Sequence, residues 1–209
     1  FRAFADAPAT AFSAAGSPAA LVARYARRVP LAVICELLGL PLHDRPRFMK
    51  WTNRLLNITN AAGFFGLIPT MYVMKRYLGG QLEAARRDGG EGLIAELIRV
   101  EREGGRISPD EMVAMVFLLL GAGTETTTHL ISGSAFELLR DPKLRDWLEE
   151  DWSRANMAIE EFLRFVSPVQ FSKPRFVRKD VELDGVRLKA GERVMATVAA
   201  ANMDPTADE

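Results

Sequence analysis

The longest stretch of this chain without a helix break limits its fold more than any other feature of the sequence. It begins at Ser108, Pro109 and Glu111, which match a helix cap, a first-turn proline and a capping-box glutamate. The next proline is Pro142, so we predict one helix over about residues 109–140. At about 1.5 Å per residue it would be about 48 Å long, enough to cross a whole domain.

The rest of the chain is predicted to be mainly helical, with β-structure near its C-terminal end. Apolar residues at helical spacing predict further helices over about residues 17–28, 31–38, 45–57, 71–87, 93–103 and 154–165. The glycine-containing segment over 60–69 is placed outside the helices. Asp184-Gly185 between two short runs predicts a hairpin over about 181–188. We expect one domain over residues 1–209, mainly α with a small β-sheet or hairpin.

Composition and charge limit the kinds of partner. The chain has 27 Lys plus Arg and 27 Asp plus Glu, so no excess charge favours nucleic acid or an anionic membrane surface. The longest apolar run, Met112 to Gly123, is shorter than the roughly 20 residues that span a bilayer, so no membrane segment is expected. A single cysteine, Cys35, excludes an internal disulfide framework and is compatible with a reducing compartment, which favours a cytoplasmic protein.

The centre of the predicted long helix breaks helix-propensity rules at one place. Residues 121–128 read Gly-Ala-Gly-Thr-Glu-Thr-Thr-Thr, and each glycine costs about 0.5 to 1 kcal/mol relative to alanine. Small residues let another group approach the backbone, and a threonine hydroxyl bonded to its own helix can bend the axis. Glu125 beside Thr126 is a carboxylate and alcohol pair that could relay protons. A kinked core helix, with Glu125 paired to a neighbouring base, explains the same residues equally well.

The segment Ala122-Gly123-x-Glu125-Thr126-Thr127 resembles the oxygen-activation motif of the cytochromes P-450. That resemblance implies a partial cytochrome P-450 fold of the bacterial soluble type, in which this helix lies over a haem. Thr126 would steady dioxygen and Glu125 would belong to the proton pathway, so both are predicted catalytic residues. Ala122 and Gly123 would lie against the cofactor.

The resemblance extends to a Glu-x-x-Arg signature at Glu161 and Arg164, where it implies a structural ion pair. Position singles this pair out, because the same spacing recurs at Glu83/Arg86, Glu96/Arg99, Glu103/Arg106 and Glu137/Arg140. Downstream, Arg175 is the candidate to bind a haem propionate, because a guanidinium suits a carboxylate. Arg178 is a weaker alternative, and a surface arginine beside Asp180 is the competing interpretation of Arg175.

The chain departs from the family in its cysteine. A haem-thiolate enzyme needs a cysteine thiolate on the iron, and Cys35 lies in an apolar helical segment without a glycine-rich loop. We interpret Cys35 as a buried small hydrophobe. The ligand loop is expected after Glu209 and the early sheet before Phe1, so the chain is interpreted as an internal fragment that is inactive alone.

The resulting hypothesis is a haem-dependent monooxygenase that inserts one atom of dioxygen into a small apolar organic substrate. The resemblance implies haem b, dioxygen as co-substrate, and an electron-transfer partner, either a ferredoxin or a flavoprotein reductase. Leu118, Gly121 and Phe171 are the predicted substrate contacts. No nucleic-acid partner and no protein-bound metal other than haem iron are expected.

Two other functions remain open on the sequence. One is a non-catalytic helical remnant or scaffold that cannot bind haem, which the missing cysteine ligand favours for this chain. The other is a metal-dependent hydrolase using Glu125 and His129, which are four residues apart. The chain has no His-Glu-x-x-His pattern, so a core or cavity histidine is the preferred interpretation of His129.

Overall fold

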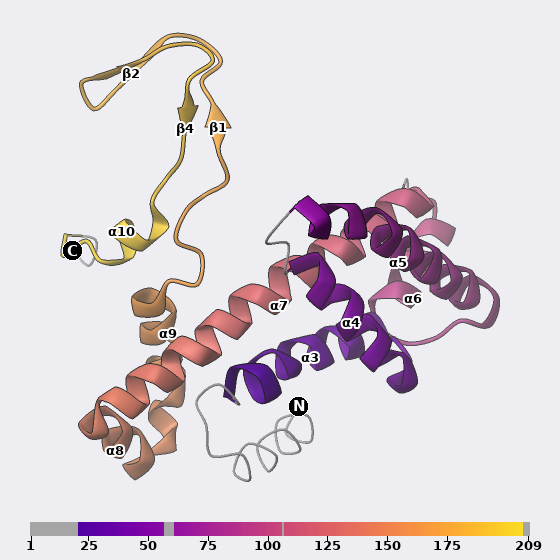
Figure 1. Cartoon of the computed structure of the whole chain (residues 1–209), viewed down its shortest axis with the longest axis horizontal. Coiled ribbons are helices and arrows are strands. Elements are labelled where there is room, and N and C mark those ends of the chain that lie inside the picture. Colours follow the sequence, from indigo (N-terminus) through magenta and orange to yellow (C-terminus); the bar gives the residue numbers. More distant parts are fainter. Residues whose placement is uncertain (1–20, 57–60, 106, 207–209) are drawn as a thin grey trace. The chain divides into compact units, whose positions relative to one another are not determined.

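The computed structural model describes residues 21–56, 61–105 and 107–206, and most of these residues are helical (Figure 1). Contacts divide the chain into two compact units, Phe1–Thr128 and His129–Glu209, and each is described separately. The boundary falls inside the long helix α7. The predicted helix start near residue 17, the pair Glu103/Arg106 and the expected chain ends involve residues outside the described ranges.

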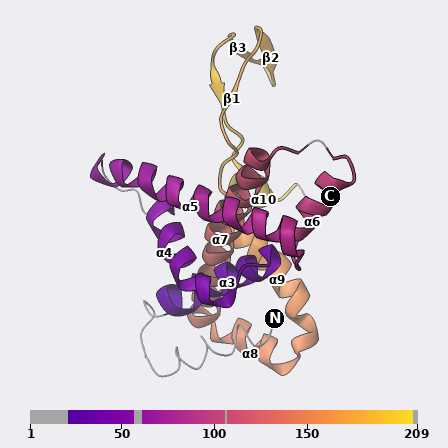
Figure 2. The same cartoon turned by 90° about the vertical axis from the view of Figure 1, so that its right-hand side faces the viewer.

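Every regular element in the described part of the first unit is a helix. Its elements are η1 (Leu21–Ala26), α3 (Arg28–Leu38), η2 (Leu42–Asp44), α4 (Arg45–Leu56), α5 (Ala61–Asp88), α6 (Leu93–Arg102) and the first part of α7 (Pro109–Arg140). Helix α4 packs against α5, α5 against α6, and α3 against both α4 and α6 (Figure 2). The bounds of α7 are those predicted from the sequence.

Two predicted boundaries in this unit are wrong. Helix α3 begins at Arg28 and takes Pro30 into its first turn, where a missing N–H breaks no bond within the helix. Helix α5 begins at Ala61 rather than Met71 and continues through Pro69. Local propensity is a weak guide where a helix can bear the cost of an internal proline.

A single apolar core holds the first unit together. Phe48, Met74 and Met112 have 0% exposure, and they come from α4, α5 and α7. The same cluster contains Leu31, Ile34, Cys35, Leu38, Leu40, Trp51, Leu78, Leu82, Ile94, Leu97, Ile98, Val113, Val116 and Leu120. The start of α7 is therefore anchored by side chains from four other helices.

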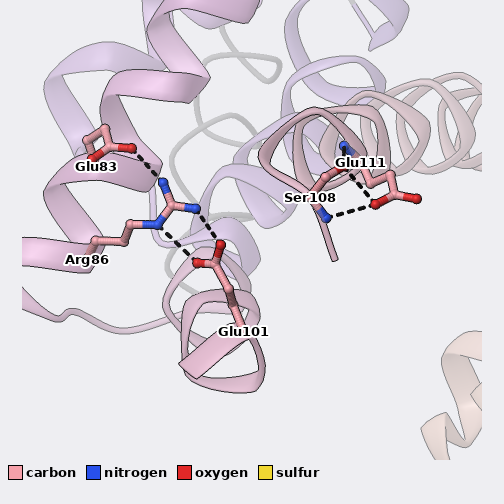
Figure 3. Close-up of polar contacts among 5 residues, drawn as sticks. All are labelled: Glu83, Arg86, Glu101, Ser108 and Glu111. Carbon is pink, nitrogen blue, oxygen red and sulfur yellow. Dashed lines mark hydrogen bonds and ion pairs between the residues drawn. The ribbon is translucent and has the colours of Figure 1, made fainter. Parts of the chain in front are cut away.

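The capping box predicted for α7 is present (Figure 3). The backbone N–H of Ser108 donates to the Glu111 carboxylate at 2.7 Å, and the N–H of Glu111 donates to Ser108 Oγ at 3.3 Å. The N–H of Ser108, followed by its hydroxyl, holds the pKa of Glu111 below its usual range. The reciprocal bonds fix the residue at which α7 begins.

The second unit combines helices with short strand pairs. After the remainder of α7 it contains α8 (Pro142–Glu150), η3 (Trp152–Arg154), α9 (Ala155–Val166), β1 (Arg175–Phe176), β2 (Val181–Leu183), β3 (Val186–Leu188), β4 (Arg193–Val194) and α10 (Val198–Asn202). Strand β1 pairs antiparallel with β4, and β2 with β3. Asp184 and Gly185 have φ of 47° and 77°, the positive values that a tight hairpin turn needs.

Helix α8 was missed in the sequence, although its start is encoded there. Asp141 accepts hydrogen bonds from the N–H groups of Lys143 and Leu144, and Pro142 occupies the first turn. The same dipeptide that ends α7 thus begins α8. A small core of Leu148, Ala158 and Phe162 joins α8 to α9.

By length and composition, helix α7 is long and apolar enough to cross a membrane. No membrane segment was expected from the sequence because the unbroken apolar run, Met112 to Gly123, is shorter than the helix. Its best 18-residue window has a mean hydropathy of 1.2, and 22% of that window is buried. Core helices of soluble proteins can have the same length and apolar composition, so one such helix does not establish a membrane span. In the first unit, Met112, Val116 and Leu120 of α7 are packed in the apolar core.

Candidate active site on helix α7

Within the first unit, α7 presents one buried and one exposed stripe of residues. The buried stripe contains Val116, Leu120, Thr124 and Thr128, spaced four residues apart, each with 5% exposure or less. The exposed stripe contains Leu118, Gly121, Ala122 and Glu125. Intervals of three, four and seven residues place these four on one helix face. Four of the predicted site residues therefore share this outer stripe.

Thr126 lies at the edge of the outer stripe and is bonded to its own helix. Its hydroxyl donates to the carbonyl oxygen of Ala122 at 2.5 Å. Such a bond competes with the helical ladder and favours local bending. Thr126 Oγ1 keeps its lone pairs, so it can still accept a hydrogen bond.

The Glu125 side chain is exposed, and no salt bridge joins it to any other residue that the structure describes. The competing interpretation, a glutamate paired with a neighbouring base in a kinked core helix, has no such base among those residues. The carboxylate is therefore open to water and can exchange protons with it.

The two glycines of the motif face different surroundings. A Cβ built on Gly123 would lie 2.8 Å from Cδ1 of Ile34 in α3, whereas one built on Gly121 would meet nothing within 4 Å. Ile34 is in the apolar core. The space left by the missing side chain of Gly123 is thus filled from within this unit, and the space beside Gly121 is open.

Cys35 is buried in the apolar core with 0% exposure. Burial raises the pKa of its thiol to about 11, and the positive charge of Arg45 opposes this only in part. A thiol with such a pKa is protonated at neutral pH and is a poor metal ligand. The interpretation of Cys35 as a buried small hydrophobe is confirmed.

In the second unit, Glu161 and Arg164 of α9 form a two-pronged ion pair. Arg164 Nε donates to Glu161 Oε2 at 2.7 Å, and Nη2 donates to Oε1 at 2.6 Å. This pairing lowers the pKa of Glu161. Arg164 Nη1 also donates to the carbonyl oxygen of Asn202 at 2.7 Å. The pair thus connects α9 to α10, which is a structural arrangement.

A second set of bonds beside this pair was not predicted. Ser167, which ends α9 at a φ of 42°, donates its hydroxyl to the Arg164 carbonyl at 2.7 Å. The side-chain amide of Asn202 donates to Ser167 Oγ at 2.8 Å. Ser167-Pro168 is a helix-ending signal in the sequence, but the partner at Asn202 cannot be read from it.

Arg175 and Phe171 also belong to the second unit. Arg175 lies exposed on β1 opposite Val194, and no salt bridge joins it to another described residue. Asp180, its suggested partner, accepts the N–H of Ala190 at 2.9 Å. Phe171 is 53% exposed and forms an isolated β-bridge with Thr197.

Arg86 is a structural residue that sequence analysis missed. It donates to both oxygens of Glu101, from Nε at 3.0 Å and from Nη2 at 2.7 Å, and also to Glu83 at 2.5 Å (Figure 3). From the sequence alone, Glu83 and Arg86 are an ordinary ion pair three residues apart in one helix. The structure adds Glu101, so Arg86 joins α5 to α6.

No cluster of three or more metal-ligating side chains occurs in the described part of the chain. His129 is exposed rather than placed in a core. The described residues therefore add no third ligand to the Glu125 and His129 pair on which a metal-dependent hydrolase would depend.

Comparison with known proteins identifies the family of the chain. Residues 74–207 match the family model for cytochrome P-450. The chain belongs to this family. The matched region includes α7 with its glycine and threonine motif, the Glu161–Arg164 pair and both strand pairs.

The similar proteins are bacterial cytochromes P-450 about twice as long as the chain. Vitamin D(3) 25-hydroxylase from Pseudonocardia autotrophica is 42% identical over 188 residues, which are 90% of this chain and 46% of the relative. Mycinamicin IV hydroxylase/epoxidase from Micromonospora griseorubida is 34% identical, over 92% of this chain and 48% of its own length. The chain spans about half the length of the curated relatives it matches.

Solved structures agree with the fold. A myxobacterial cytochrome P-450 in complex with myristic acid is 41% identical with a TM-score of 0.79, over 89% of this chain and 46% of its own. A Bacillus megaterium enzyme in complex with corticosterone is 31% identical with a TM-score of 0.83, over 89% of this chain and 51% of its own. The prediction of a partial cytochrome P-450 fold is confirmed.

Proposed function

We propose that the whole protein is a haem-dependent monooxygenase that inserts one atom of dioxygen into an apolar organic substrate. The observation that carries this proposal is the outer stripe of α7. It places the carboxylate of Glu125 on the same helix face as the apolar Leu118 and the side-chain-poor Gly121 and Ala122. An apolar surface with one proton-exchanging group suits oxygenation of an apolar molecule.

The α7 residues of the first unit suit contact with a haem, Arg175 of the second unit suits one of its propionates, and the single cysteine does not suit its iron. Gly121 and Ala122 leave the α7 backbone open to a flat apolar ring, and Gly123 lies beside them with its own space filled by Ile34. The exposed guanidinium of Arg175 suits a propionate. Cys35, with its raised pKa and full burial, does not suit the thiolate position.

The bound haem would supply the redox chemistry that activates dioxygen. The chain would supply proton handling. Glu125 takes protons from water at its exposed carboxylate, and Thr126 orients a hydroxyl at the edge of the same stripe. Adjacent helix residues point about 100° apart, so a water molecule is needed to carry a proton between them.

For partners, we propose a small apolar organic substrate; two of the similar proteins are named as hydroxylases of vitamin D(3) and of mycinamicin IV. Leu118, Gly121 and Phe171 remain the proposed contacts. Electrons would come from a ferredoxin or a flavoprotein reductase in the cytoplasm. The Glu161–Arg164 pair would hold α9 to α10 rather than take part in chemistry.

The test of this function is the coupling of electron use to product formation in the haem-loaded enzyme. Thr126→Ala removes the hydroxyl, so we expect product formed per reductant consumed to fall several-fold while reductant oxidation continues. Thr126→Ser keeps a hydroxyl and should restore coupling. Unchanged coupling in Thr126→Ala would refute the role of Thr126.

A non-catalytic scaffold is the second candidate, and the burial of Cys35 is the observation that favours it for these 209 residues. The test is to add haem to the 209-residue chain and record the spectrum of the reduced, carbon-monoxide-treated sample. The scaffold predicts no thiolate-type band. Such a band would refute the scaffold, because it would show haem held by a thiolate of this chain.

A further inference from the structure

Thr128 connects α7 to a segment 102 residues earlier in the chain. Its hydroxyl oxygen lies 3.1 Å from the carbonyl oxygen of Ala26 and 2.6 Å from that of Thr124. Thr128 is 5% exposed and Ala26 is 0% exposed. These three residues all belong to the first unit. The site proposed above does not use this contact.

The carbonyl of Ala26 cannot obtain its usual donor from the helix that follows. Ala26 is the last residue of η1, which is a π-helix, and in the four-residue spacing of the α-helix α3 that follows, the donor to its carbonyl would be the N–H of residue 30, where Pro30 has none. The next N–H, on Leu31, belongs by the same spacing to Arg27, because α3 begins at Arg28. A buried carbonyl without a donor is costly. The Thr128 hydroxyl takes the place of the donor that proline removes.

The Thr128 hydroxyl has one proton and two nearby carbonyl acceptors. Among the residues that the structure describes, only one of these two carbonyls has another hydrogen-bond donor. Within α7 the carbonyl of Thr124 has an ordinary helical donor, the backbone N–H of Thr128 four residues later. The carbonyl of Ala26 has lost the corresponding donor. The bond between helices is therefore the one whose loss leaves a buried group without a partner.

We propose that Thr128 is a positioning residue for the Glu125 and Thr126 pair. Its bond to Ala26 and the contact of Ile34 with Gly123 hold α7 on both sides of that pair. Rotation of α7 by one residue, about 100°, would move Glu125 off the outer stripe. The two contacts oppose this rotation. This inference rests on the proposed function of the pair, but the contact itself is tested separately.

Thr124 provides a matched control one helical turn earlier. It lies on the same buried stripe with the same 5% exposure, but its hydroxyl has no hydrogen-bond partner among the residues that the structure describes. Replacement by valine removes the hydroxyl and keeps the shape of the side chain. The same substitution thus removes a bonded hydroxyl at Thr128 and an unbonded one at Thr124.

The first experiment measures the folding equilibrium of the full chain by chemical denaturation. We expect Thr128→Val to lower the equilibrium constant about 5- to 10-fold, Thr128→Ser to restore it, and Thr124→Val to leave it unchanged or raise it. Pro30→Ala returns an N–H to the carbonyl of Ala26. In that background, Thr128→Val should lower the equilibrium constant by less than about 2-fold, because the carbonyl of Ala26 then has a backbone donor in α3, the helix that follows it.

Equal effects of Thr128→Val and Thr124→Val would overturn the contact. An undiminished effect of Thr128→Val in the Pro30→Ala background would overturn the explanation by proline. If Pro30→Ala does not fold, the comparison of Thr128→Val, Thr128→Ser and Thr124→Val decides alone.

The second experiment measures coupling in haem-loaded enzyme well below its unfolding temperature. A positioning role predicts that Thr128→Val lowers product per reductant at least 2-fold, that Thr128→Ser restores it, and that Thr124→Val does not change it. Unchanged coupling in Thr128→Val would overturn the positioning role. Failure of Thr126→Ala to change coupling would instead refute the proposed role of Thr126, and the denaturation result would stand.

Discussion

At the scale of single residues, Gly121 and Gly123 have the same side chain but different tolerances. Gly121→Ala gains helix propensity in open space, so we expect the free energy of unfolding to rise by about 0.5 to 1 kcal/mol. Gly123→Ala gains the same propensity but meets Ile34 Cδ1 at 2.8 Å, so a net loss of about 1 kcal/mol is expected. Chemical denaturation of both variants checks the difference.

Ile34 supplies the control for this comparison. Ile34→Val removes Cδ1, the atom nearest to the added methyl group. Gly123→Ala should then be neutral or stabilising in the Ile34→Val background. A loss of the same size in both backgrounds would show that the contact does not limit Gly123.

Cys35 and Tyr77 make the chain sensitive to alkaline pH. Burial raises the pKa of Cys35 from an ordinary value of about 9 to about 11. Burial, followed by its hydrogen bond to Asp44, also raises the pKa of Tyr77. Between pH 9 and 11 the unfolded chain loses these protons while the folded chain keeps them. Stability is therefore full below pH 9 and falls as pH rises, by up to about 3 kcal/mol for Cys35.

The measurement is the free energy of unfolding at a series of pH values from 7 to 11. Cys35→Ala should make the fall shallower, since alanine has no proton to lose. Tyr77→Phe should do the same at the upper end of the range. A fall that is as steep in both variants would show that other groups cause it.

At the scale of elements, Arg86 makes a testable connection between α5 and α6. Arg86→Ala removes two bonds to Glu101 and one to Glu83, and should lower the free energy of unfolding by about 1 kcal/mol. Arg86→Lys should not restore it fully, because an ammonium cannot donate in the two-pronged geometry. Thermal and chemical denaturation measure both variants.

Glu83→Gln is the matched control for this connection. If the bond between helices is what stabilises, Glu101→Gln will cost more than Glu83→Gln. The reverse order would show that the pair within α5 carries the effect.

The two stripes of α7 predict opposite results from the same substitution. Leu118 is 69% exposed and Leu120 is 2% exposed. Leu120→Ala should lower the free energy of unfolding by about 2 to 5 kcal/mol, and Leu118→Ala should change it by less than about 0.5 kcal/mol. If Leu118 contacts substrate, Leu118→Ala will weaken the spectral response to an apolar ligand without loss of stability. Similar destabilisation by both would contradict the two-stripe arrangement.

The elements also show which signals the sequence carries. Ser108 and Glu111 predicted the start of α7 because a capping box is local and needs no distant partner. Gly39, which ends α3 with a φ of 76°, is an equally local signal. Gly39 also lies close to Gly92: a Cβ built on Gly92 would lie 2.5 Å from the backbone N of Gly39. This contact could not be predicted from the sequence because it joins segments far apart in the chain.

At the scale of the whole molecule, the two units differ in how much they bury. The core of the first unit includes Met74, Leu78, Met112 and Val116, each with 1% exposure or less, whereas the strands of the β2–β3 pair have almost every residue exposed. We expect amide hydrogens of α5 and the start of α7 to exchange slowest and those of β2 and β3 among the fastest. Hydrogen exchange read by mass spectrometry checks this order. Equal protection in both regions would contradict it.

The family and its fold could be predicted from the sequence because the glycine and threonine motif is contiguous. The site was predictable only in part. Leu118, Gly121, Ala122 and Glu125 were named from the family resemblance, and the structure places them on one face of α7, whereas the Thr128 contact with Ala26 depends on two helices meeting. Arg175 and Phe171 lie on short, exposed strands and bridges, where neither spacing nor burial identifies a role.

The separation of α7 into two stripes has a consequence for altering substrate preference by mutagenesis. A library that randomises Leu118 samples a position that the core of the first unit does not use, so most members should retain the fold. A library at Leu120 and Thr124 would lose most members to misfolding before any preference could be screened. The helix thus separates the positions at which selectivity can be changed from those at which foldability is decided.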